Sequence, residues 1–169
     1  GVACVLSDMK KTLLISAIQI RSATVLDLPK INSLIGLAVM NWPMAKRLKR
    51  LAVPVLRYDQ ADLTFLEVLV ATFRGEVVGV AAWDTTTSQV SPTGQGGLFH
   101  GLYVLPLIQG QGVGEKLMAA VFDDARGHQV KGLLIKAQRV SKSYFSHHGI
   151  QALAANDGDY PWRYWKALA

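Results

Sequence analysis

The sequence of 169 residues predicts a mixed α/β fold, and three observations carry that prediction. Residues 98–104 are apolar and aromatic, as strands are, and spaced glycines follow them before apolar residues recur at helical spacing. Residues 65–73 and 77–83 suit two strands joined by a turn that contains Gly75. Apolar residues between 31 and 38 recur at the spacing of one helix face. Strand and helix signals therefore occur within one chain.

The N-terminal third is predicted to form one strand and two helices. Residues 18–25 suit a strand, and Asp27 can cap the helix that follows, with Pro29 tolerated in its first turn. Asn41 is predicted to cap a second helix. A dense basic cluster lies along this second helix and consists of Lys46, Arg47, Lys49 and Arg50. We expect this cluster to be a solvated helix face, with a cofactor-phosphate or substrate role as the less favoured reading.

The remainder of the chain is predicted to continue the sheet. Residues 84–97 are polar, contain glycine and are rich in Thr and Ser, which predicts a loop. The glycine-rich stretch that follows leads into a helix ending near Arg126. Residues 131–138 and 163–168 suit two further strands.

Length and composition favour a single domain with one sizeable core. We expect residues 18–169 to form it, with residues 1–17 as an N-terminal extension or tag remnant and a lead-in. Hydrophobic residues make up 50% and charged residues 18% of the chain, which disfavours disorder. No stretch reaches the roughly 20 uninterrupted apolar residues of a membrane span. The single cysteine, Cys4, excludes an internal disulfide and fits a reducing, cytoplasmic location.

The net charge of +6 admits three kinds of anionic partner, namely nucleic acid, an acidic membrane surface or an anionic cofactor. The basic cluster has no interleaved aromatic residue, and no nucleic-acid-binding motif is recognisable. We therefore expect an anionic cofactor, neither nucleic acid nor a membrane as partner, and a monomer or homodimer.

Residues 98–117 place glycines where a strand passes into a helix. A helix start leaves free backbone N–H groups at the positive end of the helix dipole, and glycines let an anion approach closely. The stretch therefore predicts a pocket for phosphate. It is neither a dinucleotide-binding fingerprint nor a P-loop, because each of these needs a glycine at position 115, where Glu115 stands.

Gln109, Gly112 and Gly114 form the pattern Gln-x-x-Gly-x-Gly, after a strand that ends Tyr103-Val104-x-Pro106. This pattern resembles the acetyl-CoA-binding signature of the GNAT N-acetyltransferases. The resemblance covers residues 18–168 and implies a central, mostly antiparallel, splayed mixed sheet with helices on both faces. It implies acetyl-CoA as cofactor and direct acetyl transfer to the primary amine of a small molecule or peptide. A non-catalytic acyl-CoA sensor or interaction module on the same fold is the alternative.

The resemblance also implies which residues bind the cofactor. Backbone N–H groups of the glycine loop would bind the pyrophosphate, and the preceding strand would present backbone groups to the pantetheine arm. The residues assigned to the cofactor are Leu102, Tyr103, Val104, Gln109, Gly110, Gln111, Gly112, Val113, Gly114, Gln138 and Tyr144. No metal site is expected.

Acetyl transfer to an amine needs a base for the amine and an acid for the departing thiolate. Members of the family often carry a carboxylate on the strand before the glycines, and Leu98 occupies that place here. His100 lies two residues on, on the same strand face, and is the candidate base. Asp84, at the end of the neighbouring predicted strand, competes with it. Phe145 stands where the family often has a tyrosine, so Tyr144 is the candidate acid, although adjacent helix residues point about 100° apart.

Overall fold

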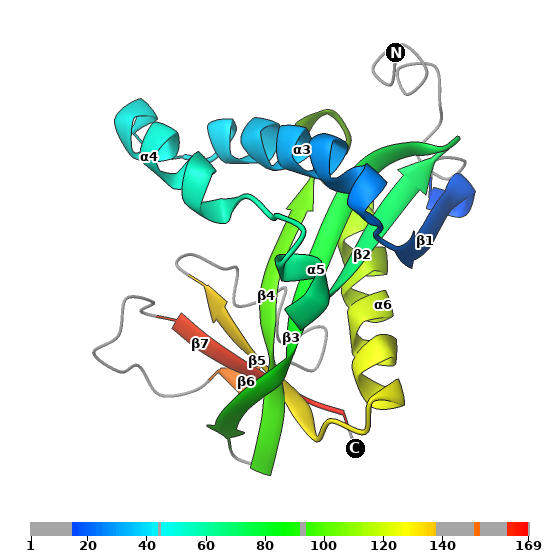
Figure 1. The fold of residues 1–169 in the computed structure, drawn as a ribbon, viewed down its shortest axis with the longest axis vertical. Coiled ribbons are helices and arrows are strands. Elements are labelled where there is room, and N and C mark those ends of the chain that lie inside the picture. The colour runs from blue at the N-terminus through cyan, green and yellow to red at the C-terminus, as the bar shows by residue number, and fades with distance from the viewer. Residues whose placement is uncertain (1–14, 44, 92–93, 138–150, 153–161, 169) are drawn as a thin grey trace. The chain divides into compact units, whose positions relative to one another are not determined.

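The structure, a computed structural model, describes residues 15–43, 45–91, 94–137, 151–152 and 162–168 (Figure 1). The helices are α3 (Leu28–Met40), α4 (Lys46–Leu56), α5 (Asp62–Phe65) and α6 (Val113–Gly127), and the short 3-10 turns are η1 (Val25–Asp27) and η2 (Pro106–Ile108). The strands are β1 (Ile18–Ser22), β2 (Leu66–Phe73), β3 (Glu76–Ser91), β4 (Gly94–Val104), β5 (Gly132–Ala137), β6 (Gln151–Ala152) and β7 (Trp162–Ala167). The predicted mixed α/β class is confirmed.

The strands hydrogen-bond in the order β1-β2-β3-β4-β5-β7-β6. The sheet is mixed, because β4 pairs with β5 in parallel while β1–β2, β5–β7 and β6–β7 are antiparallel. The chain divides into two compact units. The N-terminal unit comprises residues 1–82 and 101–120, and the C-terminal unit comprises residues 83–100 and 121–169. Strands β3 and β4 and helix α6 contribute residues to both units.

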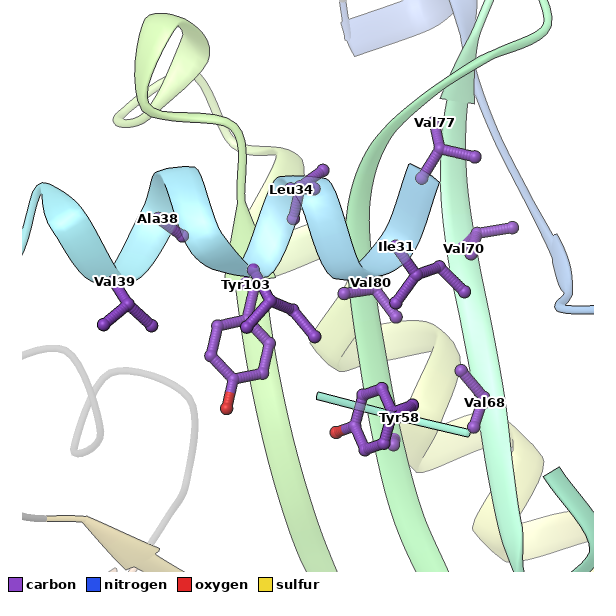
Figure 2. Packing of buried hydrophobic residues seen from close by; sticks show 12 residues of the cluster. Ile31, Leu34, Ala38, Val39, Tyr58, Val68, Val70, Val77, Val80 and Tyr103 are labelled. Atoms are coloured by element: carbon purple, nitrogen blue, oxygen red, sulfur yellow. The ribbon is translucent and has the colours of Figure 1, made fainter. Parts of the chain in front are cut away.

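Helix α3 covers one face of the strands of the N-terminal unit (Figure 2). Its buried residues recur at the predicted helical spacing and meet valines of β2 and β3, with aromatic rings beside them. The cluster contains Ile31, Leu34, Ile35, Ala38, Val39, Tyr58, Val68, Val70, Val77, Val80, Ala82 and Tyr103. Ten of these twelve side chains are aliphatic, so burial of apolar surface is what holds α3 on the sheet.

The predicted start of the second helix is wrong. Asn41 ends α3, where its backbone N–H bonds to the carbonyls of Ala38 and Val39, and α4 begins only at Lys46. Pro43 lies between the two helices. An Asn after an apolar periodic run is as compatible with a helix end as with a helix start, because its short polar side chain suits both termini.

The predicted loop at residues 84–97 is also wrong. Strand β3 continues to Ser91 and β4 begins at Gly94, so most of this segment is strand. Three consecutive threonines follow Asp84, and threonine is β-branched and favours extended backbone even where the segment is polar. Asp84 therefore lies within a strand rather than at its end.

Asp27 stands at the predicted helix start, but its carboxylate makes no hydrogen bond to the helix. It accepts two hydrogen bonds from the guanidinium of Arg21, at 2.7 and 2.8 Å, and one from the backbone N–H of Thr24 at 2.8 Å. The Arg21 guanidinium, followed by the Thr24 N–H, lowers the pKa of Asp27 to about 2, against the opposing effect of burial. The carboxylate thus joins β1 to the turn before α3.

Replacing Asp27 by asparagine is expected to destabilise the protein at neutral pH. A carboxyl whose pKa falls on folding contributes stability above its unfolded pKa of 3.8, and loses it as the pH falls toward 2. Because the Arg21 side chain is 45% exposed, we expect about 1–2 kcal/mol rather than the full value of the shift.

Urea unfolding at pH 7 and at about pH 2.5, which lies between the unfolded and the folded pKa, measures this contribution. The gap between the wild type and Asp27→Asn should narrow at the lower pH. Asp123→Asn is the matched control, because the Asp123 carboxylate also pairs with an arginine, at 2.8 Å, but is 78% exposed. An equal effect of the two substitutions at pH 7 would contradict the assignment.

Candidate active site

The glycine loop has the strand–turn–helix form that the sequence predicts. Strand β4 ends at Val104, η2 follows it, and α6 begins at Val113. Gly110 has φ +78° and Gly112 has φ +90°, a region that side chains other than glycine rarely adopt. The carbonyl of Gly112 accepts the hydrogen bond of the Lys116 N–H at 3.1 Å, which is the first turn of the helix. The amides at this helix start are the kind that bind anions.

Two further glycines, Gly79 and Gly114, lie where the first turn of α6 packs on the sheet. A Cβ on Gly79 of β3 would lie 2.7 Å from Leu117 Cδ1 and 3.4 Å from Val113 Cγ1, so a larger residue here would require the Leu117 side chain to shift. A Cβ on Gly114 would lie 3.7 Å from both Leu102 and Val104. Helix α6 therefore packs on the face of these strands opposite α3, and helices cover both faces, as expected.

Strand β4 directs alternate backbone groups toward opposite edges. The N–H of Leu105 bonds to the carbonyl of Val78 in β3 at 2.9 Å, so Leu105 and Tyr103 direct their polar backbone groups toward β3. Leu102 and Val104 therefore direct theirs to the other edge. The ladder between β4 and β5 joins residues 97–99 to 133–135 and, among the described residues, includes neither Leu102 nor Val104. This edge of β4 suits a ligand that pairs with backbone groups.

Tyr103 contributes its side chain to the core rather than to this edge. Its ring is buried and lies parallel to the Trp42 ring, at 6.4 Å between centroids. Tyr58 lies in the same cluster, and a Cβ on Gly101 would be 3.1 Å from its hydroxyl (Figure 2). The Asn32 side-chain amide donates a hydrogen bond to the Tyr58 carbonyl and accepts one from the Tyr58 backbone N–H, both at 2.8 Å. Burial raises the pKa of Tyr58, so its phenol stays protonated.

The N-terminal lead-in touches the glycine loop. A Cβ on Gly112 would lie 3.3 Å from the side chain of Ile15. The Lys116 ammonium donates hydrogen bonds to the carbonyls of Ile15 and Ile18, at 3.2 and 2.5 Å. Lys116 therefore anchors the segment before β1. On the other side of the loop, Gln109 is exposed and its Oε1 accepts a 3.4 Å hydrogen bond from Asn41.

The two candidate bases lie on one face of the C-terminal unit. The Trp83 indole donates to Asp124 of α6 at 2.8 Å, and the rings of Phe99 and Phe122 of α6 are 6.4 Å apart. Because successive strand residues alternate, Asp84 and His100 both point away from α6. Asp84 is half-buried and His100 is exposed.

Asp84 and His100 are nonetheless separate candidates. The carbonyl of Asp84 lies 2.9 Å from the position of a Cβ on Gly97, which places Asp84 beside Gly97 on the neighbouring strand. His100 is three residues farther along β4, a rise of about 10 Å. This separation is too long for a hydrogen-bonded pair, so each residue would act without the other.

Gln138, Tyr144 and Phe145 lie outside the described residues, so their predicted roles stay predictions. The sequence-based reasoning missed Gly79, whose signal was a lone glycine inside a strand of valines. It also missed the contact of Ile15 with the loop, for which the sequence carries no local signal. In the described part of the chain, no helix is long and apolar enough to cross a membrane, and no group of three or more His, Cys, Asp or Glu residues could hold a metal ion.

Comparisons with known proteins agree with this geometry. The model of the acetyltransferase (GNAT) family matches residues 35–150. The PaiA N-acetyltransferase of Thermoplasma acidophilum, solved in complex with coenzyme A, superposes with a TM-score of 0.71 at 11% identity, covering 89% of this chain and 98% of its own. A GNAT acetyltransferase from Brucella melitensis in complex with acetyl-CoA gives 0.67 at 21% identity, covering 90% and 88%.

An acetyltransferase of the same family from Staphylococcus aureus gives a TM-score of 0.64 at 14% identity, covering 90% of this chain and all of its own. Because these identities are low, the superpositions establish the fold alone. No curated protein sequence matches the chain.

Proposed function

The chain belongs to the GNAT family of acetyltransferases, and from this membership we propose that it transfers an acetyl group from acetyl-CoA to a primary amine of a small molecule or peptide. The observation that carries the proposal is the loop of positive-φ glycines at the start of α6, directly after a strand edge with outward-facing backbone groups. A helix start preceded by glycines suits a pyrophosphate, because its backbone amides are free to bind an anion, and a strand edge suits the amide-bearing pantetheine arm.

The residues present fit the cofactor. Gly110 and Gly112 give the loop its left-handed turns, and among the described residues a Cβ on Gly110 would meet nothing within 4 Å, which leaves the backbone there open to a ligand. The amides between Gly110 and Gly114 would hold the pyrophosphate. The backbone groups of Leu102 and Val104 would hold the pantetheine arm, and acetyl-CoA supplies the activated acetyl thioester when bound.

We assign the proton transfer from the amine to His100, with Asp84 as its competitor. Both side chains point to the same face of their unit, and His100 is two residues from Leu102, where the pantetheine arm would lie. An amine can attack only in its neutral form, so a base near the end of that arm would raise the reactive fraction of the acceptor. We propose Tyr144 as the acid that protonates the departing thiolate. We also expect a cytoplasmic location.

Acetyl-CoA is expected to raise the melting temperature of the purified protein, because a ligand that binds only the folded state stabilises it by mass action. A concentration of about 100 times Kd would add roughly 2.7 kcal/mol. A panel of amines, amino acids and short peptides then tests turnover through release of free thiol. No melting shift at saturating acetyl-CoA would refute cofactor binding. A shift without thiol release from any acceptor would favour the acyl-CoA sensor instead.

A further inference from the structure

Helix α4 exposes an apolar stripe that no other part of the described structure covers. Leu48, Leu51 and Val55 are 51%, 64% and 81% exposed, and the helix contains no buried residue. At 100° per residue these three side chains lie within an arc of about 60°, along about 10 Å of helix. Isolated exposed leucines are ordinary on protein surfaces, but a stripe of three on one helix face is not.

The stripe is distinct from the face by which α4 packs on its own unit. Ala52, Val53 and Leu56 pack against the core cluster, and Val53 Cγ1 lies 4.0 Å from where a Cβ of Gly36 in α3 would be. The ammonium of Lys49 lies on this inner side too and donates a 2.7 Å hydrogen bond to the carbonyl of Met40. The helix is therefore already anchored, and the stripe is not needed for folding.

Basic side chains occupy the rest of the outward face. At 100° per residue, Arg47 and Arg50 lie about 40° and 100° from the edge of the stripe, and Lys46 lies about 140° from it. All three are exposed, and none of them has an acidic partner in the described residues. The sequence of α4 contains no acidic residue at all. The solvated face that the sequence predicted explains these cations, but it does not explain three leucine and valine side chains in solvent beside them.

We propose that α4 docks on an anionic lipid bilayer, with the apolar stripe at the level of the acyl chains and Arg47 and Arg50 on the lipid phosphates. A surface helix with leucines on one side and Lys or Arg on the other has the composition of interfacial helices, whose long basic side chains extend to the headgroups. The proposal is independent of the acetyltransferase function.

Two other occupants fit the surface less well. A second copy of the chain, packed through the same stripe, would bring six unpaired cations together with no acidic residue on either helix. An acidic protein would satisfy the charges, but the stripe lies on a convex single helix, which suits a plane better than a side-chain pocket. The expectation of no membrane partner rested on the basic cluster being a solvated face and on the absence of a long apolar run. The first did not take the neighbouring apolar stripe into account, and the second concerns spanning segments only.

Cosedimentation of the purified protein with lipid vesicles tests the proposal. Binding is expected to vesicles of phosphatidylcholine mixed with phosphatidylglycerol, not to pure phosphatidylcholine, and to weaken as salt rises. The double variant Arg47→Gln/Arg50→Gln and the double variant Leu51→Gln/Val55→Gln are each expected to bind about tenfold more weakly or worse. Glutamine is a good helix former, and melting curves verify that the variants fold.

Leu26→Gln is the matched control, because Leu26 is 89% exposed in the same unit but lies outside α4. The Leu26→Gln variant should bind vesicles as tightly as the wild type does. Failure of the wild type to bind the anionic vesicles overturns the proposal, as does unchanged binding of both double variants. A dimer that Leu51→Gln/Val55→Gln dissociates in sedimentation velocity would assign the stripe to a second copy. Equally tight binding of soluble polyglutamate, insensitive to the Leu51 and Val55 changes, would assign the cations to an acidic protein.

Discussion

Replacing Gly112 by valine is expected to abolish binding of coenzyme A. Gly112 has φ +90°, which a β-branched residue cannot adopt without strain. The added side chain would also press on Ile15, because the Cβ alone would stand 3.3 Å from the Ile15 side chain. The backbone amides of the loop would then move away from the pyrophosphate. We expect affinity to fall by at least about 100-fold, or roughly 2.7 kcal/mol, as measured by isothermal titration calorimetry.

Two further variants separate the possible causes. Gly112→Asn retains access to the left-handed region, so it tests steric obstruction with less backbone strain. Gly127→Ala changes a glycine at the far end of the same helix, where a Cβ would meet no atom of the described part of the chain within 4 Å. This variant should bind coenzyme A as the wild type does. If Gly112→Val folds and binds coenzyme A with wild-type affinity, the loop is not the pyrophosphate site.

Replacing His100 by alanine is expected to lower kcat by about 100-fold or more, the usual contribution of a general base. The Kd of acetyl-CoA should change little, because the proposed cofactor contacts come from backbone groups of other residues. His100 is exposed on β4, so its removal leaves no cavity, and melting curves verify that the variant folds. Steady-state kinetics with the best amine of the panel, together with calorimetry for acetyl-CoA, measure the two effects separately.

Asp84→Asn is the comparator for this experiment. Asparagine keeps the size of the side chain and removes its capacity to accept a proton. A large loss of kcat in Asp84→Asn with normal turnover in His100→Ala would transfer the role of base to Asp84. Normal turnover in both variants would mean that the amine loses its proton to solvent.

The glycine loop was predicted correctly because its signals are local. Pro106 ends the strand, positive φ angles demand glycine at 110 and 112, and the apolar spacing behind them specifies a helix. The same holds for α3, whose predicted apolar face is the buried one. The prediction of secondary structure failed where one local signal is compatible with two different structures. Asn41 suits either end of a helix, and the threonines after Asp84 suit a strand as well as a loop.

The sequence by itself indicated the family, the mixed α/β class, the main strands and helices and the place of the glycine loop, because propensity, turn chemistry and periodicity act over a few residues. Only the tertiary structure decided which distant residues contact that loop and its helix: Gly79 lies under α6, and Lys116 bonds to the lead-in. It also decided that Asp27 pairs with Arg21 instead of capping its helix. It also decided that the apolar stripe of α4 faces solvent. Each of these depends on which distant residue packing brings near, and no local pattern encodes that.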